Sequence, residues 1–189
     1  ELFYWDYVIG MVLFSLLIGF TLGSFGEQGR SFATDLAQAD PKHIGSVLLG
    51  GAVFNAANIL LSASVSLAGL AVAFPLGVGL ALVLGVIVNY LGAPKGDPVV
   101  LFAGVALIVV AIILNGAASA GQTRGTQRSN RKGIVLAAVA GVIMAFFYRF
   151  VAAAMDLDNF ANPTPGMLTP YSALFIFSIG VLLSNFVFN

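Results

Sequence analysis

The chain has 189 residues, of which 59% are hydrophobic and only 8% are charged, and its formal net charge is zero. Soluble domains are about 45–50% apolar and about 25% charged, so this composition excludes a soluble enzyme and a nucleic-acid-binding protein. The chain has no cysteine, which excludes disulfides and thiolate sites, and with a single histidine, His43, we expect no metal site and no cofactor.

The sixteen charged residues leave long segments of the chain uncharged. Asp, Glu, Lys and Arg are absent from residues 7–26, 43–94, 98–123, 133–148 and 159–189. An uncharged apolar segment of about 18 or more residues is what a bilayer-spanning helix requires. The sequence therefore predicts an all-α, polytopic integral membrane protein of the cell (plasma or inner) membrane.

Six crossings account for these segments, each about 30 Å long or slightly less at a rise of about 1.5 Å per residue. They are Tyr7–Gly26, Ile44–Ser64, Leu67–Leu91, Val99–Ala118, Gly133–Met155 and Tyr171–Phe188. The uncharged run from residue 44 to 94 is too long for one crossing, and its least apolar point, Ser62–Ser66, is the predicted turn. Small residues at every fourth position, such as Gly77, Ala81 and Gly85, predict closely packed helices.

The basic residues predict the orientation of the chain in the membrane. Half of them, Arg124, Arg128, Arg131 and Lys132, lie between residues 121 and 132, which the positive-inside rule makes a cytoplasmic loop. The N-terminus is then cytoplasmic, and residues 27–43, 92–98 and 156–169 are external. Three basic residues on the external side, at positions 30, 42 and 95, run against this rule.

Polar residues share one face of the second predicted crossing. Gly51, Asn55, Asn58 and Ser62 are spaced by four, three and four residues, which brings them to one side of a helix. Their amides and hydroxyl can hydrogen-bond an uncharged polar solute, or they can bond a neighbouring helix and stabilise the bundle by about 1 kcal/mol each or less. Both readings stay open at this point.

The third predicted crossing contains a proline beside an aromatic ring. Pro75 removes a backbone hydrogen bond and bends or loosens a helix, which transporters use near their solute sites, although such a kink is also common without a function. Phe74 is positioned to stack on a planar ring.

Two charged residues are candidates for gating or coupling. Arg149 is the one charge within a predicted crossing; it either reaches the headgroups or pairs with an acid such as Asp156 at the outer mouth. Glu27 follows the first crossing directly and is either a solvated loop charge, able to pair with Arg30, or a group for proton coupling.

Several short motifs along most of the chain resemble the ureide permease family of the drug/metabolite transporter superfamily. They are Tyr4-Trp5-Asp6-Tyr7, Phe20-Thr21-Leu22-Gly23-Ser24, Asp35-Leu36-Ala37-Gln38, Gly50-Gly51 with Asn58, Gly69-Leu70-Ala71-Val72 and Pro170-Tyr171-Ser172-Ala173-Leu174-Phe175. The segment Gly26-Glu27-Gln28-Gly29 departs from the family, since no acid is expected there.

The resemblance implies a ten-helix carrier built from two related five-helix halves in opposite orientations. Residues 1–189 would be a single transmembrane domain and a fragment of a longer protein. Residues 1–118 would be four crossings of the first half, residues 119–132 the cytoplasmic connection, and residues 133–189 the first two crossings of the second half. Plant members of the family carry ureides and pyrimidine bases.

These observations predict a secondary transporter that moves a small polar organic solute, such as a ureide, nucleobase or sugar, by alternating access. The solute would contact Asn55, Asn58, Ser62, Phe74 and Pro75, while Glu27 and Arg149 would serve coupling or gating. The expected partners are the lipid bilayer, the solute, a coupling proton or cation, and either a second copy or the remaining helices. The alternative is a non-transporting structural or accessory subunit. An exporter of hydrophobic cations is disfavoured, because no carboxylate is embedded in a crossing.

Overall fold

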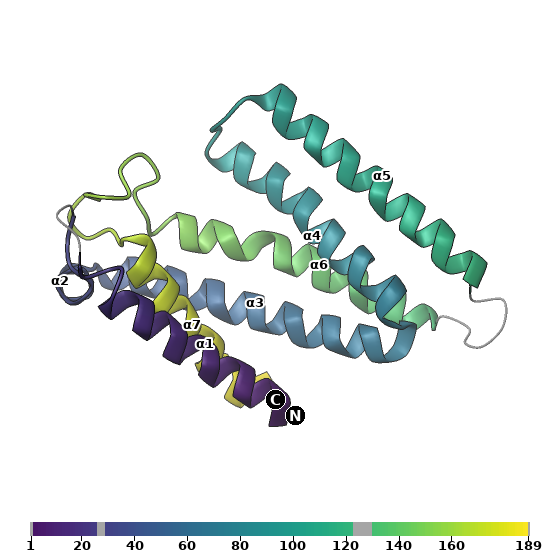
Figure 1. Ribbon diagram of the computed structural model, residues 1–189, viewed down its shortest axis with the longest axis horizontal. Helices are drawn as coiled ribbons and strands as arrows, with labels where there is room; N and C mark the ends of the chain where they lie inside the picture. The colour runs from purple at the N-terminus through teal and green to yellow at the C-terminus, as the bar shows by residue number, and fades with distance from the viewer. Residues whose placement is uncertain (1, 26–28, 123–129, 189) are drawn as a thin grey trace. The chain divides into compact units, whose positions relative to one another are not determined.

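A computed structural model of the protein describes residues 2–25, 29–122 and 130–188 (Figure 1). These residues form helices without a β-strand, apart from an isolated bridge between Met155 and Leu168. The helices are α1 (Leu2–Phe20), α2 (Phe32–Gln38), α3 (Pro41–Ala68), α4 (Leu70–Gly92), α5 (Pro98–Gln122), α6 (Arg131–Ala152) and α7 (Pro170–Phe188). The predicted all-α fold is confirmed.

Five of the described helices, α3 to α7, are long and apolar enough to cross a membrane, and α1 is a shorter apolar helix. The predicted end of the first crossing at Gly26 is wrong, because α1 ends at Phe20 and the chain turns directly after it. In this turn the Thr21 hydroxyl donates to the Leu17 carbonyl (2.7 Å) and the Gly23 amide donates to the Ile18 carbonyl (3.0 Å). These bonds satisfy carbonyls that an ending helix leaves free.

The chain divides into two compact units, of which the first comprises residues 1–55 and 147–189. Within it α1 and α7 lie side by side (Figure 1) and run antiparallel, since Trp5 packs on Phe186 and the Ser15 hydroxyl meets that of Ser178. Helix α3 runs parallel to α7, and its Gly51 meets the Phe177 carbonyl so closely that a Cβ atom would not fit. Close backbone approach of this kind holds helices together in lipid.

The second unit, residues 56–146, contains the end of α3, helices α4 and α5 and most of α6. The predicted turn at Ser62–Ser66 is wrong, because α3 continues to Ala68 and the chain turns at Gly69. Gly69 has φ 82°, a conformation that favours glycine. The serines do not end the helix, since the hydroxyls of Ser62 and Ser66 donate to carbonyls of their own helix.

Glycines also set the helix contacts of the second unit. The Leu61 side chain of α3 lies against Gly77 of α4, and a Cβ atom on Gly141 of α6 would lie 2.5 Å from the Gly77 carbonyl oxygen. Ser64 adds a buried hydrogen bond of 2.7 Å from its hydroxyl to the Gly133 carbonyl. The small residues thus lie where helices meet, as their spacing predicts.

Candidate functional site

Helix α2 positions a buried carboxylate at one end of the first unit. The ring of Phe32 packs edge-on between Phe20 of α1 and Phe175 of α7, at centroid distances of 5.1 and 5.5 Å. Phe32 and Asp35 are one turn apart, so anchoring the ring also buries the carboxylate, whose residue is 0% exposed. The sequence pattern predicts an external loop here, whereas the structure forms this short helix.

The Asp35 carboxylate is surrounded by donors. Its Oδ1 accepts from Nε of Arg30 at 3.0 Å and from the Gln38 amide at 3.3 Å. Its Oδ2 accepts from the backbone N–H of Thr169 at 2.8 Å and from the Thr169 hydroxyl at 2.9 Å. A buried carboxylate is tolerated when it is both paired and hydrogen-bonded in this way.

The same residues fasten the segment before α7. Arg30 donates from Nη1 to the Pro163 carbonyl and from Nη2 to the Met167 carbonyl, both at 2.8 Å. Gln38 donates to the Met167 carbonyl (2.9 Å) and accepts from the Gly166 amide (2.6 Å). We call Arg30, Asp35, Gln38 and Thr169 the Asp35 clamp. It joins the start of α7 to α2.

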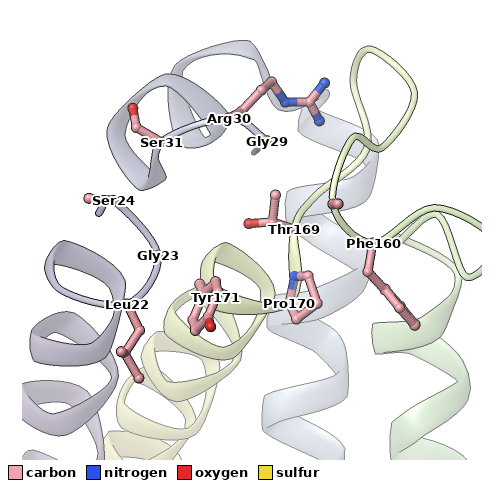
Figure 2. Close-up of a pocket in the computed structure, with 11 residues that line it drawn as sticks. Leu22, Gly23, Ser24, Gly29, Arg30, Ser31, Phe160, Thr169, Pro170 and Tyr171 are labelled. Atoms are coloured by element: carbon pink, nitrogen blue, oxygen red, sulfur yellow. The ribbon is translucent and has the colours of Figure 1, made fainter. Parts of the chain in front are cut away.

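A cavity of about 370 Å³ lies beside the Asp35 clamp, within the first unit (Figure 2). It is lined by the turn after α1, the segment before α2 and the segment that enters α7, with the residues Leu22, Gly23, Ser24, Gly29, Arg30, Ser31, Phe160, Ala161, Thr169, Pro170 and Tyr171. Its volume falls in the range of small-molecule sites.

The lining of this cavity combines apolar surface with hydrogen-bonding groups. The Arg30 side chain is 22% exposed, and it donates one N–H to Asp35 and one each to the Pro163 and Met167 carbonyls. Among the described residues this leaves two of its five N–H donors for a ligand. Ser24, Ser31 and Tyr171 add hydroxyl groups, and Phe160 adds a ring. Such a set suits a neutral polar molecule with carbonyl oxygens.

Of the predicted solute contacts, Asn55 is fully engaged in the protein. Its Oδ1 accepts from the Tyr4 hydroxyl at 3.0 Å, and its Nδ2 donates to the Val181 carbonyl (3.2 Å) and the Ser184 hydroxyl (3.0 Å). The residue is completely buried and ties α1, α3 and α7 together. This geometry favours the helix-packing reading for Asn55.

Asn58 and Ser62 lie further along α3, in the second unit. Asn58 is half-buried, and within the described part of the chain its carboxamide makes no hydrogen bond. Ser62 is exposed and donates to the backbone carbonyl of Asn58 at 2.9 Å. The Asn58 carboxamide is therefore available to a ligand, whereas the Ser62 hydroxyl is used within its own helix.

Phe74 and Pro75 lie near the start of α4, with the Phe74 ring 49% exposed. The contact of Leu61 with Gly77 fixes the register of the antiparallel α3–α4 hairpin and sets Phe74 level with Ser64. Asn58 is six residues from Ser64, which corresponds to about 9 Å along the helix axis. The structure does not bring Phe74 and Asn58 to one level of the hairpin.

Of the two charged candidates, the structure describes Arg149, which is not among the residues that line the cavity. Arg149 is exposed near the end of α6, and among the described residues it forms no ion pair, so the structure favours the headgroup reading over the pairing with Asp156. Asp156 instead accepts backbone amides of its own loop, among them Thr164 at 3.2 Å. Glu27 lies outside the described residues, and Arg30, its suggested partner, pairs with Asp35.

The Asp35 clamp is not predicted from the sequence. The isolated charge of Asp35, between Phe32 and Leu36, is a usable signal, because a buried acid needs a cationic partner. Thr169 carried no comparable signal, because it lies 134 residues from Asp35 in the sequence.

Known proteins resemble the chain over much of its length. The sequence pattern described as Ureide permease matches residues 3–131. Ureide permease 2 of Arabidopsis thaliana is 30% identical over 118 residues, which cover 60% of this chain and 30% of that protein. The chain therefore spans less than a third of that relative's length, and no solved structure matches it. Because the family pattern extends over more than half of the chain, the chain belongs to the ureide permease family.

Proposed function

We propose that the protein containing this chain is a secondary membrane transporter that moves a small polar organic solute by alternating access, and neither an enzyme nor an accessory subunit. Membership of a permease family is the observation that carries the proposal. The helices long enough to cross a membrane support it. The name of the Arabidopsis relative favours a ureide, with a nucleobase or a sugar as the other candidates.

We propose the cavity beside the Asp35 clamp as one mouth of the solute path. A ureide presents planar N–H and C=O groups, which match the two unused N–H donors of Arg30 and the cavity hydroxyls. Rings such as Tyr171 supply apolar contact to a planar solute. The clamp keeps Arg30 in place, so the donors need no reordering when a solute binds.

Within the membrane we propose Asn58 as a solute contact, since its carboxamide has no described protein partner. Phe74 would stack on a planar ring, and Pro75 would let α4 bend, because proline removes a helix hydrogen bond. Asn55 and Ser62 shape the same helix face, Asn55 by joining three helices. Glu27 and Arg149 remain proposals for coupling and gating.

The test is uptake by the full-length protein in proteoliposomes, with radiolabelled allantoin, uracil and glucose as ureide, nucleobase and sugar probes. We expect saturable uptake of at least one probe and a loss of roughly tenfold for Asn58→Ala, with normal folding. Ser66→Ala is the matched control, because Ser66 is exposed on the same helix and bonds to its own turn.

The possible outcomes separate the proposals from one another. Uptake of every probe at the level of empty liposomes would contradict the transport proposal and favour the accessory subunit. Normal uptake by Asn58→Ala would remove Asn58 from the solute path. Proton coupling is tested by repeating the assay on the wild type and on Glu27→Gln, each with and without an imposed proton gradient. The gradient should increase uptake by the wild type and leave uptake by the variant unchanged.

A further inference from the structure

Asn185, near the end of α7, is a buried carboxamide without a hydrogen-bond partner among the described residues. The residue is 0% exposed, and in the described part of the chain neither its Nδ2 nor its Oδ1 has a hydrogen-bond partner. Neighbouring polar groups on the same helix are engaged: Ser184 accepts from Asn55, and Ser178 shares a 2.9 Å hydrogen bond with Ser15. Asn185 is the exception in a well-bonded interface.

The described residues around Asn185 do not supply the missing bonds. The Ser15–Ser178 pair fixes the antiparallel register of α1 and α7. Asn185 lies seven residues after Ser178 on α7 and therefore comes level with Val8, which lies seven residues before Ser15 on α1. Val8 is completely buried and apolar. On α3, the nearby carboxamide of Asn55 spends its N–H groups on Val181 and Ser184.

An unpaired buried carboxamide lowers the stability of the folded state. A buried donor or acceptor left unsatisfied loses its hydrogen bonds to water without gaining others, whereas an apolar residue of similar size has no such loss. A polar residue held at this cost within a membrane helix is a functional candidate. The bonds that Asn185 lacks are then expected in another state of the protein.

We propose that Asn185 is a solute-binding residue at the end of α7 remote from the Asp35 clamp, which pairs with the solute when α1 and α7 separate. A carboxamide carries an NH2 group that donates and a carbonyl oxygen that accepts in one plane. One N–H and the oxygen together match the N–H and C=O edge of a ureide or a pyrimidine base. This inference rests on the proposed transport function. The cavity lies at the start of α7 and Asn185 lies near its end. Alternating access requires solute contacts toward both sides of the membrane, and Asn185 would supply one on the side opposite the cavity.

The test compares Asn185→Leu with Asn55→Leu in the full-length protein. Both changes replace a buried carboxamide on the same interface with an apolar side chain of similar size. We expect Asn185→Leu to keep or raise the melting temperature and to raise the KM for allantoin or uracil uptake about tenfold, because a pair of hydrogen bonds is lost. We expect Asn55→Leu to lower the melting temperature, since it removes bonds to three helices.

Asn185→Ala is the second variant, because the small alanine side chain avoids any clash that leucine makes in the same space. A fall in melting temperature for both Asn185 variants, as large as that of Asn55→Leu, would overturn the inference by showing a structural partner. Unchanged uptake by both variants would overturn it as well and leave the transport proposal standing. If the wild-type protein takes up no probe, the result contradicts the proposed transport function, and the inference about Asn185 is overturned together with it.

Discussion

The two units of the chain hold their helices together with different proportions of hydrogen bonds and close approaches at glycines. The first unit uses side-chain hydrogen bonds between segments: the Asp35 clamp, the Tyr4–Asn55–Ser184 bonds and the Ser15–Ser178 pair. It also has close backbone approaches, among them Gly51 against Phe177 and Gly180 against Leu48. The second unit depends chiefly on close approaches at glycines, of backbone atoms at Gly133 and Gly141 and of side chains at Gly77 and Gly79. Ser64 adds a hydrogen bond.

This difference shows that polar residues in an apolar chain need not lie on a solute path. In lipid, helices gain nothing from the hydrophobic effect on one another, so either close backbone contact or hydrogen bonds must join them. Unengaged polar groups are therefore better functional candidates than engaged ones. Asn58 in the second unit and Asn185 in the first meet this criterion among the described residues.

The largest expected effect is the loss of the clamp in the first unit. Asp35→Ala leaves Nε of Arg30 and the Thr169 amide without their acceptor, and removing one partner of a buried pair costs about 3–5 kcal/mol. We expect a fall of that order in the unfolding free energy of the full-length protein in detergent micelles. Asp40→Asn, at an exposed position of the same segment, is the control and should change little. Equal stabilities would show that the clamp is dispensable.

A smaller effect is expected from crowding the second unit. Gly141→Ala places a Cβ atom 2.5 Å from the Gly77 carbonyl oxygen, so α4 and α6 must move apart. Overpacking of this kind typically costs about 1–3 kcal/mol. Gly116→Ala in α5 is the matched control, because a Cβ atom there meets nothing within 4 Å. If both variants melt alike, close approach does not stabilise this unit.

The smallest effect is expected from one interhelical hydrogen bond. Tyr4→Phe removes the donor to Asn55 Oδ1 and should lower the unfolding free energy by about 1 kcal/mol, measured by the same denaturation. Tyr7→Phe, one turn away on the same helix, tests for a general effect of losing a hydroxyl. A larger loss for Tyr7→Phe than for Tyr4→Phe would contradict the importance of the Asn55 bonds.

The sequence predicted the long helices well, because uncharged apolar runs are a direct consequence of the bilayer as solvent. Their ends were less well predicted. Ser62–Ser66 is the least apolar point of its run, yet serine hydroxyls can bond within a helix, so the turn lies at Gly69, where the backbone needs a positive φ.

The candidate site was less predictable, because it joins residues far apart in the sequence. Arg30 and Asp35 are local, but their contacts with Pro163, Met167 and Thr169 depend on where α7 begins. Asn185 gave no sequence signal, since a lone asparagine in an apolar helix is compatible with either packing or function. Its unpaired state is visible only once the surrounding bonds are known.

The most direct test of the central proposal is a counterflow assay. Proteoliposomes containing the full-length protein are preloaded with unlabelled allantoin and diluted into a trace of labelled allantoin, with uracil and glucose tested in the same way. An alternating-access transporter of a given probe should accumulate its label transiently above the external concentration, because loaded sites exchange across the membrane. Entry of label no faster than into empty liposomes, or equilibration without an overshoot for all three probes, would contradict the account.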